Sequence, residues 1–256
     1  MTIKFEALNL DILNSLTKYP SIPTFHQLDP KRGGLLAQPP VMGGPALLTE
    51  KVDGTNSRVI CTTAGQYLIG SRGELLHGRG DLVANPALGI VETVRAFAER
   101  AVQASLPAPL TIFYGEVYGG KVTSASKQYT ANRQLGFRLF DVQVIEEPSG
   151  FVESSKEAIS KWREGGGPTF LHERLLQQYA SLLDVELTPR IGEVEVLPAE
   201  LDQTFEFLQA RIGSTQCALD DGGLGAPEGL VVRKADRSQI AKMRFADYRR
   251  TFKQRR

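Results

Sequence analysis

The segment "ALLTEKVDGTNSRVICTTAGQYLIGS" (residues 46–71) decides the fold expected from this sequence. It contains three short apolar and β-branched runs, which glycine-containing stretches separate. Runs of this kind are typical of antiparallel strands that follow one another along the chain. We therefore predict that residues 46–71 form a β-meander. The first run ends on Lys51, directly before Val-Asp-Gly, so this lysine is expected at a strand end.

The rest of the chain combines further strands with helices. Two runs with alternating apolar and aromatic residues, 110–119 and 136–145, predict the next strands. Apolar residues at helical spacing predict an amphipathic helix over 87–105. We also expect helices over 153–163, 168–183 and 200–212, and closing strands over 228–235 and 239–245. The pattern indicates an α+β fold with antiparallel sheets flanked by helices, formed by a single domain over residues 1–256.

The composition is that of an ordinary globular chain, with 41% hydrophobic and 23% charged residues. No apolar run approaches the roughly 18 residues that a membrane-spanning helix needs. The N-terminus lacks the apolar core of a secretory signal. Two cysteines, Cys61 and Cys217, suggest no disulfide framework and fit a reducing compartment. We therefore expect a cytoplasmic protein with no membrane partner.

The net charge of +1 is unevenly distributed. Residues 233–256 contain ten lysines or arginines and two aspartates, so this basic C-terminal segment carries a charge of +8. Such a segment suits the recognition of phosphate in a nucleotide or a nucleic acid. For residues 249–256 alone, a frayed and solvated tail is an equally good interpretation.

Six short segments share one pattern, in which a strand end is followed by charged residues. Taken singly, each has an ordinary explanation, because Asp-Gly and Ser-Arg-Gly are also common turn sequences. Their order along the chain gives them more weight. They are "EKVDGTN" (50–56), "GSRGEL" (70–75), "FYGEVYG" (113–119), "RLFDVQV" (138–144), "PEGLVVRK" (227–234) and "AKMR" (241–244).

In this order, the six segments resemble motifs I, Ia, III, IIIa, IV and V of the covalent nucleotidyltransferases, which include DNA ligases, RNA ligases and mRNA capping enzymes. The resemblance runs from about Tyr19 to Arg244. It implies a nucleotidyltransferase (ATP-grasp-like) fold and a lysine nucleophile, which is Lys51 here. Attack on an α-phosphate needs a neutral amine, whereas free lysine titrates near 10.4. Burial and neighbouring cations lower a lysine pKa, and the candidate cations are Lys234, Lys242, Arg244 and a bound metal.

The resemblance also implies roles for the other motif residues. The pyrophosphate leaving group calls for Mg²⁺ (or Mn²⁺), which takes one or two carboxylates in addition to phosphate oxygens. We expect Glu228 and Asp53 to supply them. Lys242 and Arg244 are expected to clamp the α-phosphate and stabilise charge developing there. The remaining nucleotide contacts are expected from Gly54 in the turn, Arg72 over the ribose or an RNA 5′-phosphate, Glu116 at the ribose hydroxyls and Phe140 against the base.

Three features are similar to RNA ligases in particular. "EKxxGTN", with Glu50 before the lysine and Asn56 after the turn, resembles the RNA ligase 2-like branch, in which that glutamate reads the adenine amino group. Asp53 departs from that branch, which often has His there. The lead-in "YPSIPTFHQL" is similar too. The 12 residues after Arg244 are too few for a C-terminal OB domain, so none is expected, and a protein partner is considered for the domain that RNA ligase 2 carries there.

The sequence therefore predicts an ATP-dependent RNA ligase that joins RNA 5′-phosphate and 3′-hydroxyl ends in RNA repair, with ATP and RNA as partners. The lysyl-AMP adduct, an adenylated RNA end and the sealed strand are its three expected products. Asn56 and Arg72 are the candidates for positioning the RNA end. Two alternatives stay open at this point: another covalent nucleotidyltransferase, such as a guanylyltransferase or a DNA ligase core, and a non-catalytic RNA-end-binding module. The form of the RNA, single-stranded, nicked duplex or broken loop, is open as well.

Overall fold

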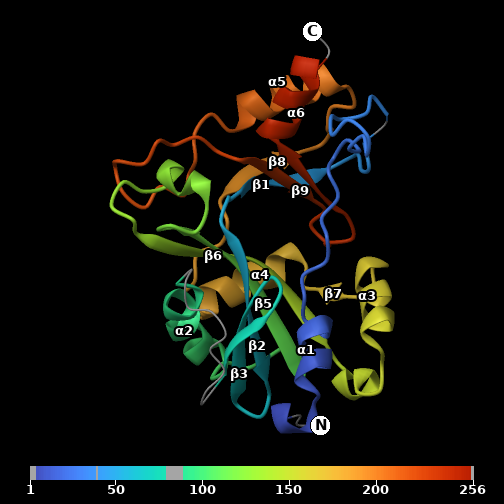
Figure 1. Cartoon of the computed structure of the whole chain (residues 1–256), viewed down its shortest axis with the longest axis vertical. Coiled ribbons are helices and arrows are strands. Elements are labelled where there is room, and N and C mark those ends of the chain that lie inside the picture. Colours follow the sequence, from blue (N-terminus) through green and yellow to red (C-terminus); the bar gives the residue numbers. More distant parts are fainter. Residues whose placement is uncertain (1–3, 39, 79–88, 255–256) are drawn as a thin grey trace. The chain divides into compact units, whose positions relative to one another are not determined.

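The computed structural model describes residues 4–38, 40–78 and 89–254. Within them it shows an α+β fold with two antiparallel sheets and six α-helices (Figure 1). The predicted α+β class is confirmed. The chain divides into two compact units. Unit 1 comprises Met1–Ser21, Gly54–Thr123 and Leu135–Leu187, and unit 2 comprises Ile22–Asp53, Ser124–Gln134 and Thr188–Arg256.

Unit 1 is built on a six-stranded antiparallel sheet with the strand order β4-β3-β2-β5-β6-β7. Strand β2 is flanked by β3 on one side and by β5 on the other. The strands are β2 (Thr55–Thr62), β3 (Gln66–Ser71), β4 (Leu75–Gly78), β5 (Leu110–Gly119), β6 (Leu135–Ile145) and β7 (Thr169–Phe170).

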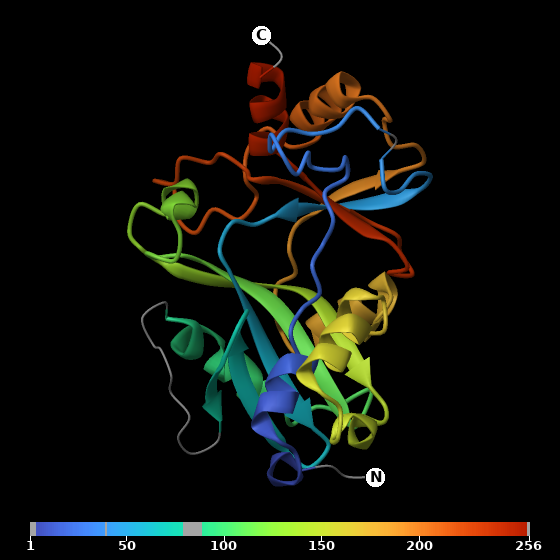
Figure 2. The same cartoon turned by 45° about the vertical axis from the view of Figure 1, so that its right-hand side comes forward.

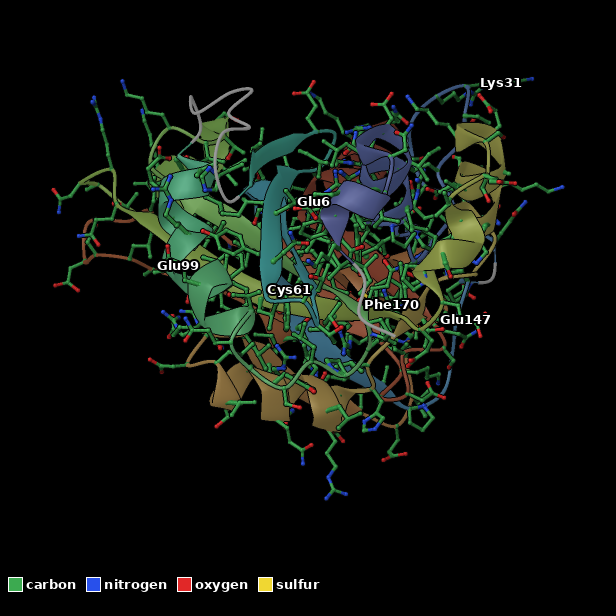
Figure 3. The ribbon with its side chains drawn as sticks, turned by 90° about the horizontal axis from the view of Figure 1, so that it is seen from below. Glu6, Lys31, Cys61, Glu99, Glu147 and Phe170 are labelled. Carbon is green, nitrogen blue, oxygen red and sulfur yellow. The ribbon has the colours of Figure 1, made fainter. Side chains whose placement is uncertain are left out.

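Helices cover both faces of this sheet. Val59 and Cys61 on β2 pack into an apolar cluster with helices α2 (Ile90–Ala101) and α4 (Glu173–Leu182). Ile60, between them in sequence, packs into a second cluster with α1 (Leu10–Leu16) and α3 (Lys156–Glu164). Figure 3 shows this arrangement, with Glu99 on α2 and Glu6 of the N-terminal segment on opposite sides of the strand that carries Cys61. Because alternate residues of a strand point to opposite faces, burial of both faces explains why Val59, Ile60 and Cys61 form a continuous apolar run.

Unit 2 is built on a four-stranded antiparallel sheet with the order β10-β9-β1-β8. Leu48, Val232 and Ala241 on its central strands pack into one apolar cluster with two helices. Figures 1 and 2 show both helices on the same side of this sheet. The elements are β1 (Ala46–Lys51), β8 (Arg190–Val194), β9 (Gly229–Arg233), β10 (Ile240–Arg244), α5 (Leu201–Arg211) and α6 (Phe245–Gln254).

The predicted meander over residues 46–71 is wrong in one respect. Its second and third runs pair as β2 and β3. The first run, β1, instead pairs with β8 and β9 in the other sheet. The chain therefore passes from one sheet to the other at "VDG", and the division between the two units falls between Asp53 and Gly54. Gly54 is required there, because an added Cβ would lie 2.2 Å from the carbonyl oxygen of Val117.

Other predicted elements are found with shifted ends. The helix expected over 87–105 spans Ile90–Ala101, and residues 87 and 88 of that prediction lie outside the described residues. The helix expected over 168–183 begins only at Glu173, because Thr169 and Phe170 pair with β6 as strand β7. Residues 249–254 belong to helix α6, so the frayed-tail interpretation is wrong for them; residues 255 and 256 lie outside the described residues.

The remaining regular elements are short 3-10 helices: η1 (Phe5–Ala7), η2 (Ser124–Gln128) and η3 (Pro148–Phe151). Among the helices that the structure describes, none is long and apolar enough to cross a lipid bilayer.

Candidate active site

Strand register brings Lys51, Gly229 and Arg244 into one row across the four-stranded sheet. Lys51 on β1 lies opposite Gly229 on β9, which lies opposite Arg244 on β10. The row that contains Lys242 follows two residues further along the strands, and its other members are Thr49 and Val231. Directly opposed residues share a face of a sheet. Lys51, Lys242 and Arg244 therefore lie on one face, which also carries Arg233, and we call it the cation face.

Gly229 makes this row possible. A Cβ atom at that position would lie 2.0 Å from the carbonyl oxygen of Met243 and 2.9 Å from Cα of Arg244. No side chain larger than hydrogen fits between backbones that approach so closely. The glycine after Glu228 thus has a steric reason, since it lets β9 and β10 pair directly beside Lys51.

Lys51 forms an ion pair with Glu228. Its Nζ donates to Oε2 of Glu228 at 2.6 Å, and the two side chains are 25% and 18% exposed. Burial raises the pKa of the Glu228 carboxyl, which Asp53 also raises and which Lys51 and Arg244 lower. The residues of the predicted motifs I, IV and V thus interact electrostatically around one buried carboxylate.

Arg244 is held by an aspartate that the sequence analysis did not single out. Its Nε donates to Oδ2 of Asp247 at 2.7 Å, and its Nη2 donates to Oδ1 at 3.0 Å. Asp247 is 1% exposed and lies in the first turn of α6, directly after β10. A bidentate carboxylate fixes the plane of a guanidinium. Arg244 is therefore oriented before any ligand binds.

Residues 22–25 of the predicted lead-in pair with β10 on the far side from β9. The amide of Lys242 donates to the carbonyl oxygen of Pro23 at 2.9 Å, and the amide of Phe25 donates to the carbonyl oxygen of Lys242 at 2.9 Å. These bonds satisfy the edge of β10. The lead-in therefore fixes the strand that carries two of the predicted phosphate-binding cations.

Glu50 points to the face opposite Lys51 and is 1% exposed. Its carboxylate accepts hydrogen bonds from the hydroxyl of Thr215 and, at 2.7 Å, from the amide of Gln216. A buried carboxylate needs such donors, because its desolvation is costly otherwise. The residue before the predicted nucleophile is thus held by the loop that connects α5 to β9.

The turn after Lys51 is held from a second segment. The amide of Asp53 donates to the hydroxyl oxygen of Tyr129 at 2.7 Å, and the ring of Tyr129 is fully buried. Tyr129 in turn accepts, at its carbonyl oxygen, the amide of Leu219 at 2.7 Å. The carboxylate of Asp220 accepts the amides of Ala131 and Asn132, and these bonds lower its pKa to about 2.

The segment 124–134 and the loop 212–227 are therefore linked to each other, and we call the two together the bracket. The bracket contacts the residues on both sides of Lys51: Glu50 through Thr215 and Gln216, and Asp53 through Tyr129. It also leads directly into Glu228, the ion-pair partner of the lysine.

The predicted residues of unit 1 form their own contacts. The amide of Gly54 donates to Oε1 of Glu116 at 3.1 Å. Asn56 lies opposite Glu116 in the β2–β5 ladder. The Oδ1 atom of Asn56 is buried and has no hydrogen-bond partner within the described part of the chain. A buried acceptor of this kind calls for a donor such as a ligand or an ordered water.

The contacts of the other two predicted residues of unit 1, Arg72 and Phe140, do not involve Glu116 among those that the structure describes. Arg72 is exposed in the turn between β3 and β4 and makes no hydrogen bond or ion pair with any residue that the structure describes. Phe140 is half-buried, and its ring packs edge-on against Tyr19 at 5.1 Å and parallel to Tyr114 at 6.5 Å between centroids. The base-stacking role of Phe140 stays a prediction.

Lys234 lies at the end of β9 that is remote from Lys51. It follows Gly229 by five positions, or about 17 Å along a strand. Its Nζ donates to the carbonyl oxygens of Gly43 at 2.6 Å and Pro45 at 2.7 Å. The structure thus does not bring its amine to Lys51, and the predicted nucleotide contact of Lys234 stays a prediction.

The carboxylates of Glu228 and Asp53 suit a divalent cation that is shared with phosphate. Residues 4–38, 40–78 and 89–254 contain no group of three or more His, Cys, Asp or Glu side chains that could hold a metal ion. Asp53 nevertheless raises the pKa of Glu228, which indicates that the two negative charges repel each other. Oxygen-only ligation by one or two carboxylates plus phosphate is the usual arrangement for Mg²⁺. The donor set therefore fits the expected ion.

Sequence reasoning missed Tyr129, Thr215 and Asp247. Tyr129 and Thr215 belong to segments without a recognisable motif, and their contacts depend on long-range folding. Asp247 gave a local signal, because it follows Arg244 by three residues at the start of a helix, where acidic side chains are favoured.

Solved structures resemble this chain in fold, and a family model matches it in sequence. The fold resembles the nucleotidyltransferase domain of RNA ligases: Naegleria gruberi RNA ligase with PPi superposes with a TM-score of 0.60 at 15% identity, covering 93% of this chain and 59% of that chain. Variants of the same ligase with ATP and Mn, and with AMP and Mn, each give a TM-score of 0.59, at 14% and 15% identity. They cover 97% and 91% of this chain and 63% and 57% of theirs.

The RNA ligase family model matches residues 44–254, and the chain belongs to the RNA ligase family. The chain spans about three fifths of the length of the solved RNA ligase chains that it resembles. A search of curated proteins gives no sequence match.

Proposed function

We propose that this protein is an ATP-dependent RNA ligase that forms a lysyl-AMP intermediate on Lys51 and then seals RNA 5′-phosphate and 3′-hydroxyl ends. The observation that carries the proposal is the Lys51–Glu228 ion pair of 2.6 Å on a face that also bears Lys242 and Arg244. A lysine placed among phosphate-binding cations and beside a proton acceptor is equipped for attack on a nucleotide phosphate. Membership of the RNA ligase family supports this assignment.

In the first step, Lys51 gives a proton to Glu228, and the neutral Nζ attacks the α-phosphorus of ATP. A P–N bond forms, the bond from the α-phosphorus to the bridging oxygen breaks, and pyrophosphate leaves. Glu228 suits the acceptor role, because burial raises the pKa of its carboxyl and its Oε2 already contacts Nζ. A general base works best when its pKa approaches the working pH.

Arg244 and Lys242 stabilise the negative charge that develops on the α-phosphate. Arg244 is prepared for this role by Asp247, which fixes its guanidinium. The ionised carboxylates of Glu228 and Asp53 would hold a Mg²⁺ or Mn²⁺ ion together with phosphate oxygens until Glu228 takes the proton, and the ion would neutralise charge on the leaving pyrophosphate.

In the second step, an oxygen of the RNA 5′-phosphate attacks the phosphorus of AMP, and the P–N bond to Lys51 breaks. In the third, an RNA 3′-hydroxyl attacks the activated 5′-phosphate, and AMP leaves. Asn56, with a buried Oδ1 that lacks a partner among the described residues, and the exposed Arg72 are the proposed contacts of the RNA end. Glu116 and Phe140 are the proposed contacts of the ribose and the base.

The choice of ATP rests on Glu50. A carboxylate only accepts hydrogen bonds, as Glu50 does from Thr215 and Gln216, so it suits a donor such as the adenine amino group. Guanine presents a carbonyl oxygen at the corresponding ring position, which a carboxylate repels. "EKxxGTN" supports placement in the RNA ligase 2-like branch, and Asp53 departs from it.

Transfer of label from α-labelled nucleotides tests the proposal. We expect a denaturation-resistant protein adduct with ATP and divalent cation, its loss in Lys51→Ala, and release of the label when a 5′-phosphorylated RNA is added. Lys161→Ala, which removes an exposed lysine from α3, is the matched control. An adduct that persists in Lys51→Ala contradicts the proposed nucleophile. Preferential labelling by GTP would favour a guanylyltransferase, and RNA binding without any adduct a non-catalytic module.

A further inference from the structure

Five exposed cations gather from two segments of unit 2 that are far apart in the sequence. Helix α6 contributes three and the loop 29–34 contributes two. On the helix, the third cation follows the first by four positions and the second by three, so it neighbours both on the helix surface. Figure 3 labels Lys31, whose side chain extends away from the ribbon. The five are Lys31, Arg32, Arg249, Arg250 and Lys253.

Hydrogen bonds fix the two segments against each other. Nη1 of Arg250 donates to the carbonyl oxygen of Gly33 at 3.0 Å, across 217 positions of sequence. Nε2 of Gln254 donates to the carbonyl oxygen of Arg32 at 3.0 Å. The amide of Leu35 donates to the hydroxyl of Thr251 at 2.8 Å. The cations of the loop therefore keep a fixed place beside those of the helix.

Both segments are also held internally. The carboxylate of Asp29 accepts the amides of Lys31 and Arg32 at 2.8 and 3.3 Å, which closes a turn at the loop tip. The guanidinium of Arg249 lies 5.2 Å from the ring centroid of Phe245. The loop and the end of the helix border a hollow of about 500 Å³, lined by Asp29, Arg32, Gly34, Leu35, Thr251 and Gln254.

We propose that this surface, formed by α6 and the loop 29–34, binds the phosphate backbone of RNA; we call it the α6 surface. The choice of RNA as the ligand rests on the proposed function. The surface is not needed for the reaction of Lys51 with ATP, and its role is to hold the RNA that receives the AMP.

Exposure of the cations argues for an extended polyanion. A solvent-exposed cation gains little from one phosphate, because water and salt screen the pair. Several exposed cations bind usefully only when one ligand contacts them together and releases its counterions. A nucleic-acid strand is such a ligand, whereas a single nucleotide is not.

The length of the helix gives a second argument. Phe245, which directly follows Arg244, and Lys253 are eight residues apart in α6, which corresponds to about 12 Å along the helix. A triphosphate held at Arg244 does not cover that length, but a strand of about four nucleotides does, at 3.4 Å of rise for each. Because α6 begins directly after Arg244 but packs on the opposite face of the sheet, an RNA end held at the cation face would reach α6 around this end of β10.

Measurement of RNA binding over a range of salt concentrations tests the proposal. The α6 pair Arg249→Gln/Lys253→Gln and the loop pair Lys31→Gln/Arg32→Gln each remove two charges. Arg250 is kept, because it bonds to Gly33 and its loss would also release the loop. The matched control is Lys161→Gln/Arg174→Gln, which removes two exposed cations from α3 and α4.

We expect each surface pair to weaken binding of a 5′-phosphorylated 20-nucleotide RNA by on the order of tenfold at low salt, and to reduce the slope of log affinity against log salt by about 1.4 for a single strand. The control pair should change neither quantity. Lysyl-AMP formation from ATP should stay within about twofold of the unaltered protein in all three variants.

Three results would overturn the proposal. Unchanged RNA affinity and slope in both surface pairs would exclude the contact. An equal loss of RNA affinity in the control pair would show that the effect depends only on the net charge of the protein and not on the α6 surface. Displacement of the RNA by polyglutamate of equal charge, at equal concentration, would identify the α6 surface as a site for acidic protein. The RNA-binding measurement needs no catalysis. Absence of a lysyl-AMP adduct in the unaltered protein would therefore contradict the proposed function, while the binding results would still test the α6 surface.

Discussion

The two sheets have the same antiparallel pairing but differ in what their faces contact. In the six-stranded sheet, alternate residues of β2 enter two different apolar clusters, so both faces are buried. In the four-stranded sheet, Leu48 and its neighbours enter one apolar cluster, whereas the opposite face carries Lys51, Lys242 and Arg244.

This difference explains where chemistry is able to reside. Cys61, at the centre of the six-stranded sheet, is fully buried, and burial raises the pKa of its thiol well above the usual range. A charged nucleophile in that position would lose its hydration without a partner. Lys51 lies on a face with other charges and keeps a quarter of its side chain exposed. A sheet with a single apolar face is therefore the one that holds a reactive amine.

Glu228→Gln should have the largest effect, because it removes the charge partner of Lys51 and keeps its shape. We expect lysyl-AMP formation to slow by about 100-fold, or about 2.7 kcal/mol of barrier. Single-turnover labelling with α-labelled ATP measures this rate. Sealing of chemically pre-adenylated RNA bypasses the lysine, so it should fall less.

The matched control for this substitution is Glu164→Gln in unit 1. Glu164 also pairs with a cation, Arg163, at 2.9 Å, but it is 41% exposed. We expect no measurable change in adduct formation for it. Equal effects of the two substitutions would show that the ion pair on the cation face has no special importance.

Tyr129→Phe should have the next largest effect and tests the bracket. The substitution keeps the buried ring and removes the oxygen that accepts the Asp53 amide. We expect about a tenfold loss in the rate of lysyl-AMP formation, with little change in the apparent affinity for ATP, because the turn beside Lys51 is less well fixed. Rapid-quench labelling at several ATP concentrations separates the two quantities. A lower melting temperature together with an unchanged rate of lysyl-AMP formation by the folded protein would assign Tyr129 to folding alone.

Tyr114→Phe is the corresponding change in the six-stranded sheet. The hydroxyl of Tyr114 is buried and lies 2.6 Å from Oε1 of Gln143 and 3.0 Å from the carbonyl oxygen of Thr17. The hydroxyl has one hydrogen to donate, so its removal leaves one of these acceptors without its donor and should lower the free energy of unfolding by about 1 kcal/mol. Urea denaturation measures this cost. The rate of lysyl-AMP formation by folded protein should stay unchanged, in contrast to Tyr129→Phe. A tenfold loss of this rate would contradict the idea that only contacts of the four-stranded sheet affect the reaction.

Sequence patterns predicted most strands and helices but not how the strands assemble. The runs at 46–51 and 55–62 look alike, because each is apolar and β-branched. Their pairing depends on distant segments: β1 joins β8 and β9, more than 100 residues away, whereas β2 joins β5, about 50 to 60 residues away. Periodicity reports burial along a strand and contains no information about its partner.

For the candidate site as well, the sequence predicted individual residues but not the contacts that hold them. Lys51, Glu228, Lys242 and Arg244 could be chosen from short motifs, and register brings Lys51 and Arg244 into one row. The partners that hold them were invisible in the sequence, because Tyr129 and Thr215 act through single hydrogen bonds over long separations. Lys234 shows the converse, since a cation near a motif in sequence lies at the far end of its strand, and its nucleotide contact stays a prediction.

The smallest expected effect concerns His26, a buried polar group beside the apolar side of the four-stranded sheet. It is 1% exposed, with Nδ1 2.9 Å from the Tyr248 hydroxyl and Nε2 2.9 Å from the carbonyl oxygen of Ala199. A carbonyl only accepts, so Nε2 carries the hydrogen and Nδ1 accepts from Tyr248. Burial lowers the pKa of His26, against the raising effects of the Ala199 carbonyl and Glu200.

The unfolded chain therefore binds a proton at His26 at higher pH than the folded chain does. Stability conferred by the neutral ring is fully present above the unfolded pKa of about 6.5 and is lost as the pH falls below it. From pH 7 to pH 6 the expected loss is less than about 0.7 kcal/mol. Urea denaturation at both pH values should show this loss in the unaltered protein and in His172→Gln, an exposed control, but not in His26→Gln. An equal pH dependence in His26→Gln would place the titrating group elsewhere and leave the apolar side of this sheet without a proton-sensitive contact.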